Sequence, residues 1–326
     1  MKRFKKILCV LEAGQSGKTV LESAVSLAEK NQARLTVIEV TEDVSTGVEM
    51  PEEGTVSIDL QGAMVSTREQ ELAMLIAPYN TRIEIKTKVL TGTPFLEIIR
   101  EVLRSGHDLV IKAPETQDWM DRLFGSDDMH LLRKCPCPVW MIKPQAINTY
   151  HCILAAVDVS DAYPPNELES RHILNQKILE IASSLTLLNG AEFHVGHAWE
   201  APAEHIMRGA FMNVSEEKVV AYVEQVRQKH ESSLNTLLSE VISCLESERL
   251  NSLKPKTHLV KGFARKQVPT LAKQIKADLV VMGTVSRTSI SGFIMGNTAE
   301  TILNQLDCSV LAIKPPGFIT PVTLED

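Results

Sequence analysis

The sequence predicts an α/β fold of two tandem domains, each with a doubly wound parallel sheet at its centre. Three observations predict it: an internal repeat, a regular alternation of strand and helix patterns, and strand segments that are apolar throughout. With 326 residues, the chain also has about twice the length of a typical single domain. Each half is therefore long enough to bury its own hydrophobic core.

The internal repeat consists of four pairs of similar segments that occur in the same order in both halves. The pairs are KILCVL (6–11) with CILAAV (152–157), LTGTP (90–94) with VKGFA (260–264), HDLVIKA (107–113) with ADLVVMG (277–283), and CPVWMIKP (137–144) with CSVLAIKP (308–315). Four ordered pairs indicate a tandem duplication. We place its seam at residues 145–149 and expect domains at residues 1–146 and 147–326.

Strand and helix patterns alternate along the first half. The apolar residues Leu21, Ala24 and Ala28, for example, return at helical spacing. The expected strands are 6–12, 33–40, 82–90, 108–113 and 137–142, and the expected helices are 17–30, 64–77, 94–105 and 126–134. A polar stretch near 41–62 separates the second strand from the second helix.

The second half follows the same order. Apolar residues from Leu174 to Leu188 return every three or four positions and predict its first helix. A longer helix is expected near 215–246, and a shorter one near 297–306. The segment DLVVM (278–282) is apolar throughout, as in a parallel sheet covered on both faces. Right-handed crossovers between such units give a doubly wound sheet, which binds ligands at the carboxyl ends of its strands where the winding reverses.

Composition and charge argue against several classes of protein. The net charge is −7 and the isoelectric point about 5.8, so a dedicated DNA or RNA binder is not expected. No run of 18 apolar residues predicts a membrane-spanning helix. Glu12 interrupts the apolar run that follows the basic N-terminus, unlike in a signal peptide, and we expect a cytoplasmic protein without membrane insertion. The six cysteines are expected to be buried thiols.

The strongest local signal lies in the second half, where one glycine ends an apolar strand and another precedes a helix. A glycine at a strand end lets the backbone approach a ligand, and amides at a helix N-terminus attract phosphate. The candidate binding residues in this loop are Gly283, Ser286, Arg287, Gly296, Asn297 and Thr298. Taken alone, the same residues also fit a capped strand-to-helix loop.

The second half resembles the nucleotide-binding members of the universal stress protein family, and the paired halves resemble its tandem-domain type. Those members carry G-x-x-G, a spacer and G-S or G-T after an apolar strand, and an Asp at the end of an early strand. Asp158 in VDVS matches that Asp, and Gly283 and Gly296 match the first and third glycines. Ser286 stands where the second glycine is expected, and Asn297 where a phosphate-binding Ser or Thr is expected. The resemblance covers essentially the whole chain.

This resemblance implies the fold and the function in more detail. Each half would be a five-stranded, flavodoxin-like domain, and the two would pair as an internal dimer, with a further homodimer and protein partners left open. The second half would bind ATP or a related nucleotide as a regulatory ligand, with Mg²⁺ only as a companion of ATP. Asp158 would contact the ribose or base, the two glycines would bring backbone near phosphate, and Arg287 would pair with phosphate. The family also implies a role in stress response and in resistance to DNA damage.

The first half lacks most of this nucleotide-binding pattern. Ala113 replaces the first glycine and Thr116 stands at the position of the second. Glu12 replaces the early Asp, and only Gly125 and Ser126 remain at the third glycine. Lost glycines and added negative charge argue against a triphosphate there, so the first half is expected to be structural or to bind something else.

Two other motifs have simpler explanations. The segment 14–19 (GQSGKT) resembles a P-loop, but Glu12 stands where that loop needs a glycine, and a polar turn with Ser16 as helix N-cap is the alternative. One histidine and two cysteines suggest a metal site, but their spacing is unusual for zinc and the cysteines fit a buried strand start. These three residues are His130, Cys135 and Cys137.

Three classes of function remain after these observations. The first is a binding module that holds a nucleotide as a regulatory ligand. The second is a slow ATPase or autokinase, although no nucleophile, base and orienting group can be assembled from the sequence. The third is a carrier of an apolar ligand or a protein-binding module, in which the extra segments 41–66 and 198–215 line or cover a cleft. The plain alternative for these segments is surface loops.

Overall fold

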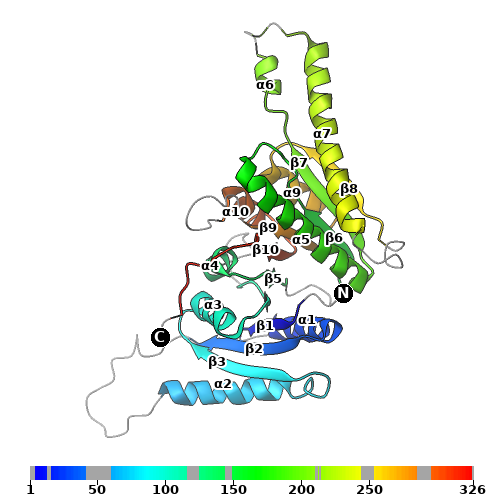
Figure 1. Cartoon of the computed structure of the whole chain (residues 1–326). Coiled ribbons are helices and arrows are strands. Elements are labelled where there is room, and N and C mark those ends of the chain that lie inside the picture. The colour runs from blue at the N-terminus through cyan, green and yellow to red at the C-terminus, as the bar shows by residue number, and fades with distance from the viewer. Residues whose placement is uncertain are drawn as a thin grey trace, which may run out of the picture. The chain divides into compact units, whose positions relative to one another are not determined.

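The structure is a computed structural model, which describes residues 4–12, 16–41, 60–115, 125–143, 149–209, 212, 214–243, 253–284 and 295–324. Two compact units divide the chain: Met1–Asn148 together with Ile319–Asp326, and Thr149–Phe318. In each unit, parallel strands form a sheet that lies between helices (Figure 1). The part of the chain that the structure describes contains no helix long and apolar enough to cross a membrane.

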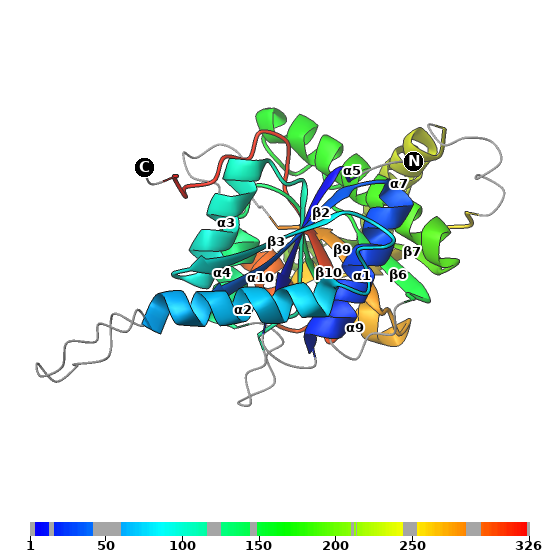
Figure 2. The same ribbon diagram turned by 90° about the horizontal axis from the view of Figure 1, so that it is seen from below.

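The first unit has the described strand order β3-β2-β1-β4-β5, and every pair is parallel. Because the order reverses between β1 and β4, right-handed crossovers place α1 and α2 on one face of the sheet and α3 and α4 on the other (Figure 2). The strands are β1 (Lys6–Leu11), β2 (Arg34–Thr41), β3 (Ile85–Thr91), β4 (Leu109–Lys112) and β5 (Val139–Met141). The helices are α1 (Ser16–Asn31), α2 (Leu60–Ile76), α3 (Pro94–Ser105) and α4 (Ser126–Lys134).

The second unit repeats this topology with the order β8-β7-β6-β9-β10, again parallel throughout its described strands. Helix α5 and the second half of α7 cover one face of the sheet (Figure 1). Helix α6 and the first half of α7 extend beyond the sheet. The strands are β6 (Cys152–Ala156), β7 (Glu192–Trp199), β8 (Lys256–Lys261), β9 (Leu279–Gly283) and β10 (Ser309–Ile313). The helices are α5 (Pro165–Asn189), α6 (Glu204–Met207), α7 (Glu216–Ser243), α9 (Ala264–Gln274) and α10 (Asn297–Leu303).

Both faces of the central strands are buried, which explains why these segments are apolar throughout. In β1, the consecutive residues Ile7, Leu8 and Cys9 all have exposed fractions of 0%. In β9, Val280 and Val281 are buried to the same extent. Consecutive side chains in a strand point to opposite faces, so helices must cover the sheet on both sides.

The predicted fold class is confirmed: in the residues that the structure describes, both units are doubly wound α/β domains, each with five parallel strands. Differences from the expected elements have local reasons. The expected strand 137–142 begins later, at Val139 of β5, and Pro138 just before it has no N–H to donate to a ladder. The segment 198–215 contains the last residues of β7 and the short helix α6, whereas the stretch 41–62 lies mostly outside the described residues.

Candidate functional site

The strand order of the second unit reverses between β6 and β9, and the described candidate residues lie near the carboxyl ends of these two strands. The strands pair in register, with Ala156 opposite Met282. Asp158 follows β6 by two residues and Gly283 ends β9, so their backbones lie at neighbouring strand ends. The amide of Gly296 donates to the carbonyl of Thr284 (3.2 Å), which brings the start of α10 to the same edge.

Asp158 is held in one orientation by four neighbours. Its backbone N–H donates to Oδ1 of Asn175 (3.1 Å), and Nδ2 of Asn175 donates to its carbonyl (2.7 Å). Its carboxylate accepts the amide of Ser160 at Oδ1 (3.1 Å) and the hydroxyl of Tyr163 at Oδ2 (2.6 Å). A guanidinium nitrogen of Arg171 lies 3.5 Å from Oδ2. The sequence identified Asp158 but none of the contacts that orient it.

Tyr163 and Arg171 support this carboxylate as a stacked pair. The Arg171 guanidinium lies over the Tyr163 ring, 3.3 Å from its centroid, and also reaches Glu167 at 3.5 Å. Burial raises the pKa of the Tyr163 hydroxyl, and the negative charge of Asp158 raises it further. The phenol therefore stays protonated at neutral pH and acts as a hydrogen-bond donor to Asp158.

A cleft of about 680 Å³ adjoins Asp158, between the segment after β6, helix α5 and helix α7. Its volume lies within the range of small-molecule sites, roughly 300–1,000 Å³. An ion pair between Lys229 and Asp161 spans its wall. Polar residues dominate the lining, among them Asp158, Ser160, Arg171, Ser233 and Thr236. The cleft thus offers hydroxyl, carboxylate and guanidinium groups next to the matched Asp.

The loop that carries the predicted phosphate-binding residues is described only at its ends. Helix α10 begins at Asn297, its N-cap is Gly296, and Asn297 and Thr298 have exposed side chains in the first turn. The capping position therefore belongs to the glycine rather than to either polar residue. Ser286 and Arg287 lie outside the described residues.

Gly283 has a packing reason to be glycine. A Cβ added at this position would lie 2.7 Å from Cδ2 of Leu174, a buried residue of α5. A side chain at this position would therefore require the Leu174 side chain to move. The glycine serves the packing of the second unit in addition to any role at a ligand.

We expect Gly283→Val to lower the free energy of unfolding of the second unit by about 1–3 kcal/mol, because the added side chain overpacks this contact. Denaturant unfolding without nucleotide would measure the loss. The double variant Gly283→Val/Leu174→Ala should recover part of it, because the smaller residue leaves room for valine. Equal stability of Gly283→Val and the unsubstituted protein would contradict the packing argument.

The corresponding edge of the first unit is occupied by an ion cluster. Nζ of Lys112, at the end of β4, lies 2.8 Å from Oε1 of Glu12 and 2.5 Å from Oδ1 of Asp128. Glu12 is the residue that replaces the matched Asp, so its carboxylate pairs with lysine in this unit. Sequence analysis missed Lys112, although a lysine inside the apolar segment VIKA was a usable signal.

The described residues give little support to a P-loop at 14–19 or to a metal site at His130, Cys135 and Cys137. Lys18 and Thr19 lie in α1, and residues 13–15 of the P-loop-like segment lie outside the described residues. Sγ atoms of Cys135 and Cys137 lie 3.6 Å apart, while the His130 ring stacks on Phe95 with centroids 4.7 Å apart. Within the described ranges, no three His, Cys, Asp or Glu side chains form a metal-binding group.

Comparison with known proteins explains the repeat. The sequence model of the universal stress protein family matches residues 3–143 and again residues 172–314. The chain belongs to the universal stress protein family. The two matches confirm both the predicted resemblance and the tandem arrangement. This universal stress protein is 31% identical to Universal stress protein E of Escherichia coli K12 over 335 residues, an alignment that covers 100% of this chain and 99% of the relative.

Solved structures share the fold over nearly the whole of this universal stress protein. A functionally unknown protein from Pseudomonas aeruginosa PAO1 has a TM-score of 0.67 at 25% identity and covers 96% of this chain and 94% of its own. A universal stress protein from Archaeoglobus fulgidus has a TM-score of 0.57 at 16% identity, covering 95% and 98%. The second likeness shows the fold alone.

Proposed function

We propose that the second unit binds ATP or a related nucleotide as a regulatory ligand. The observation that carries this proposal is the oriented carboxylate of Asp158 at the reversal between β6 and β9, next to a cleft of about 680 Å³. Doubly wound sheets bind their ligands at such reversals. Membership of the universal stress protein family supports the same interpretation. The assignment of Asp158 to the Asp of the nucleotide-binding pattern rests on the sequence VDVS directly after β6, because the second match to the family model begins only at residue 172.

The residues present fit the nucleoside end of this ligand. A carboxylate offers about four acceptor positions. In Asp158, the amide of Ser160 and the hydroxyl of Tyr163 use one on each oxygen, and Arg171 faces Oδ2. A lone pair of Oδ1 is therefore left to accept a ribose hydroxyl.

The residues at the start of α10 fit the phosphate end. Asn297 and Thr298 expose side chains that donate hydrogen bonds, and Gly283 and Gly296 bring bare backbone to the edge. Pairing of Arg287 with a phosphate and a companion Mg²⁺ on ATP belong to the proposal as well. Mg²⁺ would be held by the phosphates and would neutralise part of their charge.

We favour a binding protein over an ATPase or autokinase. Around Asp158, the described residues do not place a base beside a nucleophile, and its carboxylate is engaged by Tyr163 and Arg171. An enzyme would show multiple turnover of ATP that disappears with the binding-site substitution described below. Stoichiometric binding without turnover is the result that we expect.

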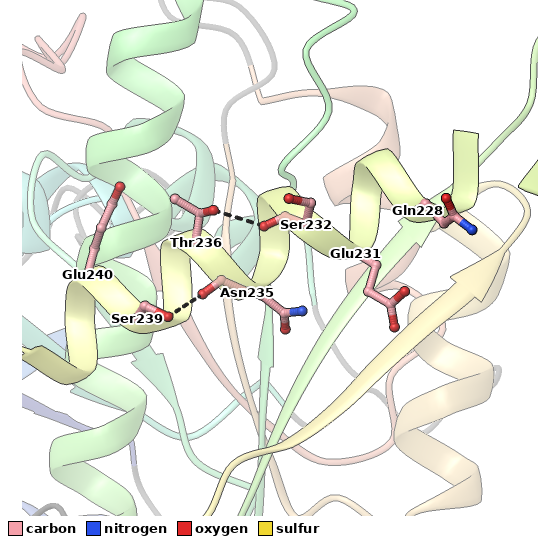
Figure 3. A pocket seen from close by; sticks show the side chains of 7 residues that line it. All are labelled: Gln228, Glu231, Ser232, Asn235, Thr236, Ser239 and Glu240. Carbon is pink, nitrogen blue, oxygen red and sulfur yellow. Dashed lines mark hydrogen bonds between the residues drawn. The ribbon is translucent and has the colours of Figure 1, made fainter. Parts of the chain in front are cut away.

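A carrier of an apolar ligand is less well supported by the described pockets. Most of the residues that line the cleft beside Asp158 are polar or charged, although apolar atoms contribute more of its exposed lining surface. A second pocket of about 530 Å³ follows the surface of α7, and all seven lining side chains are polar (Figure 3). Two of its hydroxyls donate to their own helix, Thr236 to the carbonyl of Ser232 (3.0 Å) and Ser239 to that of Asn235 (2.8 Å). Neither pocket is lined mainly by apolar side chains, as the site of a lipid-like ligand would be.

We expect Gly296→Val to abolish nucleotide binding without unfolding the second unit. The added side chain would crowd the approach of phosphate to α10, whereas the backbone of Gly296 (φ −69°, ψ 140°) is one that valine adopts readily. Calorimetric titration of ATP into the full chain measures binding, and circular dichroism checks folding. Glu12→Gln, at the matching position of the first unit, is the control and should bind as the unsubstituted protein does. Undiminished binding by Gly296→Val would refute the assignment.

The biological setting is proposed from the family. We infer a stress-response role with a contribution to DNA-damage resistance, exercised in the cytoplasm. Pairing of the two units within the chain, a further homodimer and protein partners also belong to this proposal. A deletion strain exposed to DNA-damaging agents tests the role, and complementation with Gly296→Val tests whether the role depends on the nucleotide site.

A further inference from the structure

The Asp128 carboxylate in the first unit is bound by donors from strand β4, from the segment after it and from the N-cap of its own helix α4, where it closes a capping box. Oδ1 lies 2.5 Å from Nζ of Lys112 in β4. Oδ2 accepts the amide of Glu115, in the segment after β4, at 2.7 Å, and the amide of Gly125, the N-cap of α4, at 3.3 Å. Asp128 itself has an exposed fraction of 0%. Charged and amide donors therefore converge on one buried carboxylate.

Lys112 supplies the positive charge of this site. Its side chain is almost fully buried, and burial alone would lower the pKa of its amine. The carboxylates of Asp128 and Glu12 outweigh that effect and raise the pKa, so the amine is protonated at neutral pH. A buried cation that ends a central strand is costly unless an anion lies beside it.

The second unit lacks this cluster at the matching positions. The repeat aligns HDLVIKA (107–113) with ADLVVMG (277–283), so Met282 stands in place of Lys112. Counting from the N-cap glycine of each helix, Ala299 stands in place of Asp128. Helix α10 begins without a carboxylate there, which shows that the fold does not need one to start this helix. The cluster is therefore a property of the first unit and not of the topology.

We propose that Asp128 is a built-in anion that occupies the phosphate position of the first unit and closes it to nucleotides. Carboxylate and phosphate are recognised by the same donors, namely a charged nitrogen and the amides at a helix start. The polypeptide therefore supplies the anion that a nucleotide would otherwise bring. The chain then binds one nucleotide at most, in the second unit.

Glu115 adds a second barrier at the same place. Its carboxyl group packs against Gly125, since a Cβ on that glycine would lie 1.9 Å from Oε2 of Glu115. Burial raises the pKa of Glu115 to about 7, and the negative charges of Asp128, Asp127 and Glu12 contribute, against the opposing effect of Lys112. An incoming phosphate would thus meet a filled space with negative groups around it.

Rescue by inorganic phosphate tests the proposal. All variants in this test carry Glu115→Ala, which removes the second barrier but keeps the backbone amide of residue 115. In this background, Asp128→Ala, which installs the residue of the second unit, should be less stable than its Glu115→Ala parent and should regain stability as phosphate is added at millimolar concentrations. The gain should saturate, because it reflects occupation of one site. Hydrogen exchange of the β1 and β4 amides reports on the first unit, and chloride at equal ionic strength controls for salt.

Matched variants separate a site from a general salt effect. The Glu115→Ala parent and Asp127→Ala, which removes the neighbouring carboxylate of α4, should show no saturable response to phosphate. The double variant Lys112→Met/Asp128→Ala, which carries both residues of the second unit, should fold and also fail to respond. If Asp128→Ala is unfolded in chloride, recovery of folded protein in phosphate becomes the measurement. Absence of any saturable phosphate effect on Asp128→Ala, or an equal effect on Asp127→Ala, would overturn the proposal.

Discussion

Lys112→Met should lower the free energy of unfolding of the first unit by about 3–5 kcal/mol, the usual cost of removing one partner of a buried ion pair. The substitution leaves Asp128 fully buried with a charge that only two backbone amides balance. The loss of Lys112 destabilises Glu12 less, because the Glu12 side chain is 41% exposed and water can solvate it. The loss of stability therefore comes mainly from the Asp128 carboxylate, which is left without its cation.

Denaturant unfolding followed by hydrogen exchange in β1 and β4 would measure this loss in the first unit. Lys86→Met, at an exposed lysine of β3, is the control and should change stability by well under the same amount. The double variant Lys112→Met/Asp128→Ala should be more stable than Lys112→Met, since both charged groups are gone. If Lys112→Met were as stable as the Lys86→Met control, the ion pair would contribute nothing to the stability of the first unit.

The first unit should also lose a few kcal/mol of stability as the pH falls from about 4.5 to about 2, through protonation of Glu101. This carboxylate has a side chain only 1% exposed and accepts Nζ of Lys88 and Oγ of Ser105, both at 2.7 Å. Burial alone would raise its pKa. The His107 ring, whose Nε2 lies 3.5 Å from Oε1, and the hydrogen bonds from Lys88 and Ser105 outweigh burial and lower the pKa to about 2. A carboxyl with a lowered pKa stabilises the fold above its unfolded pKa, and that contribution disappears as acid protonates it.

Comparison of the pH profiles of Glu101→Gln and the unsubstituted chain tests this assignment. The variant should be less stable at neutral pH, and the difference should shrink toward pH 2, where the native carboxyl is about half protonated. Glu71→Gln, which loses only an exposed ion pair with Arg68, should track the unsubstituted chain closely. A constant difference between Glu101→Gln and the unsubstituted chain across this range would contradict the role given to Glu101.

Most of the fold could be predicted from the sequence because its signals are local or repeated. Apolar strands such as DLVVM and helices with regular apolar spacing mark the elements, and the repeat shows that both halves share one topology. Element ends were less predictable. Pro138, just before β5, has no backbone donor, and apolar patterning does not reveal that the strand begins only at Val139.

The candidate site was predictable only where the repeat or the family pattern marks a residue. Asp158 and Gly283 fall at strand ends in any alignment of the halves, and the structure places them at neighbouring ends. The contacts from Tyr163 and Arg171 depend on how α5 packs against the sheet, which no local pattern encodes. The same packing brings Leu174 close to Gly283, which is a reason for glycine at this position that the interpretation as a ligand-binding residue did not include.

The carboxylate of Asp128 is covalently part of the chain, so its local concentration is fixed and does not follow the contents of the cell. A unit that is held together by such a group keeps the same stability whatever the supply of small anions. A unit that takes its anion from solution becomes more stable as that ligand accumulates and less stable as it is depleted. Under the two proposals above, duplication followed by this exchange would give one chain a half that is insensitive to metabolite level and a half that responds to it.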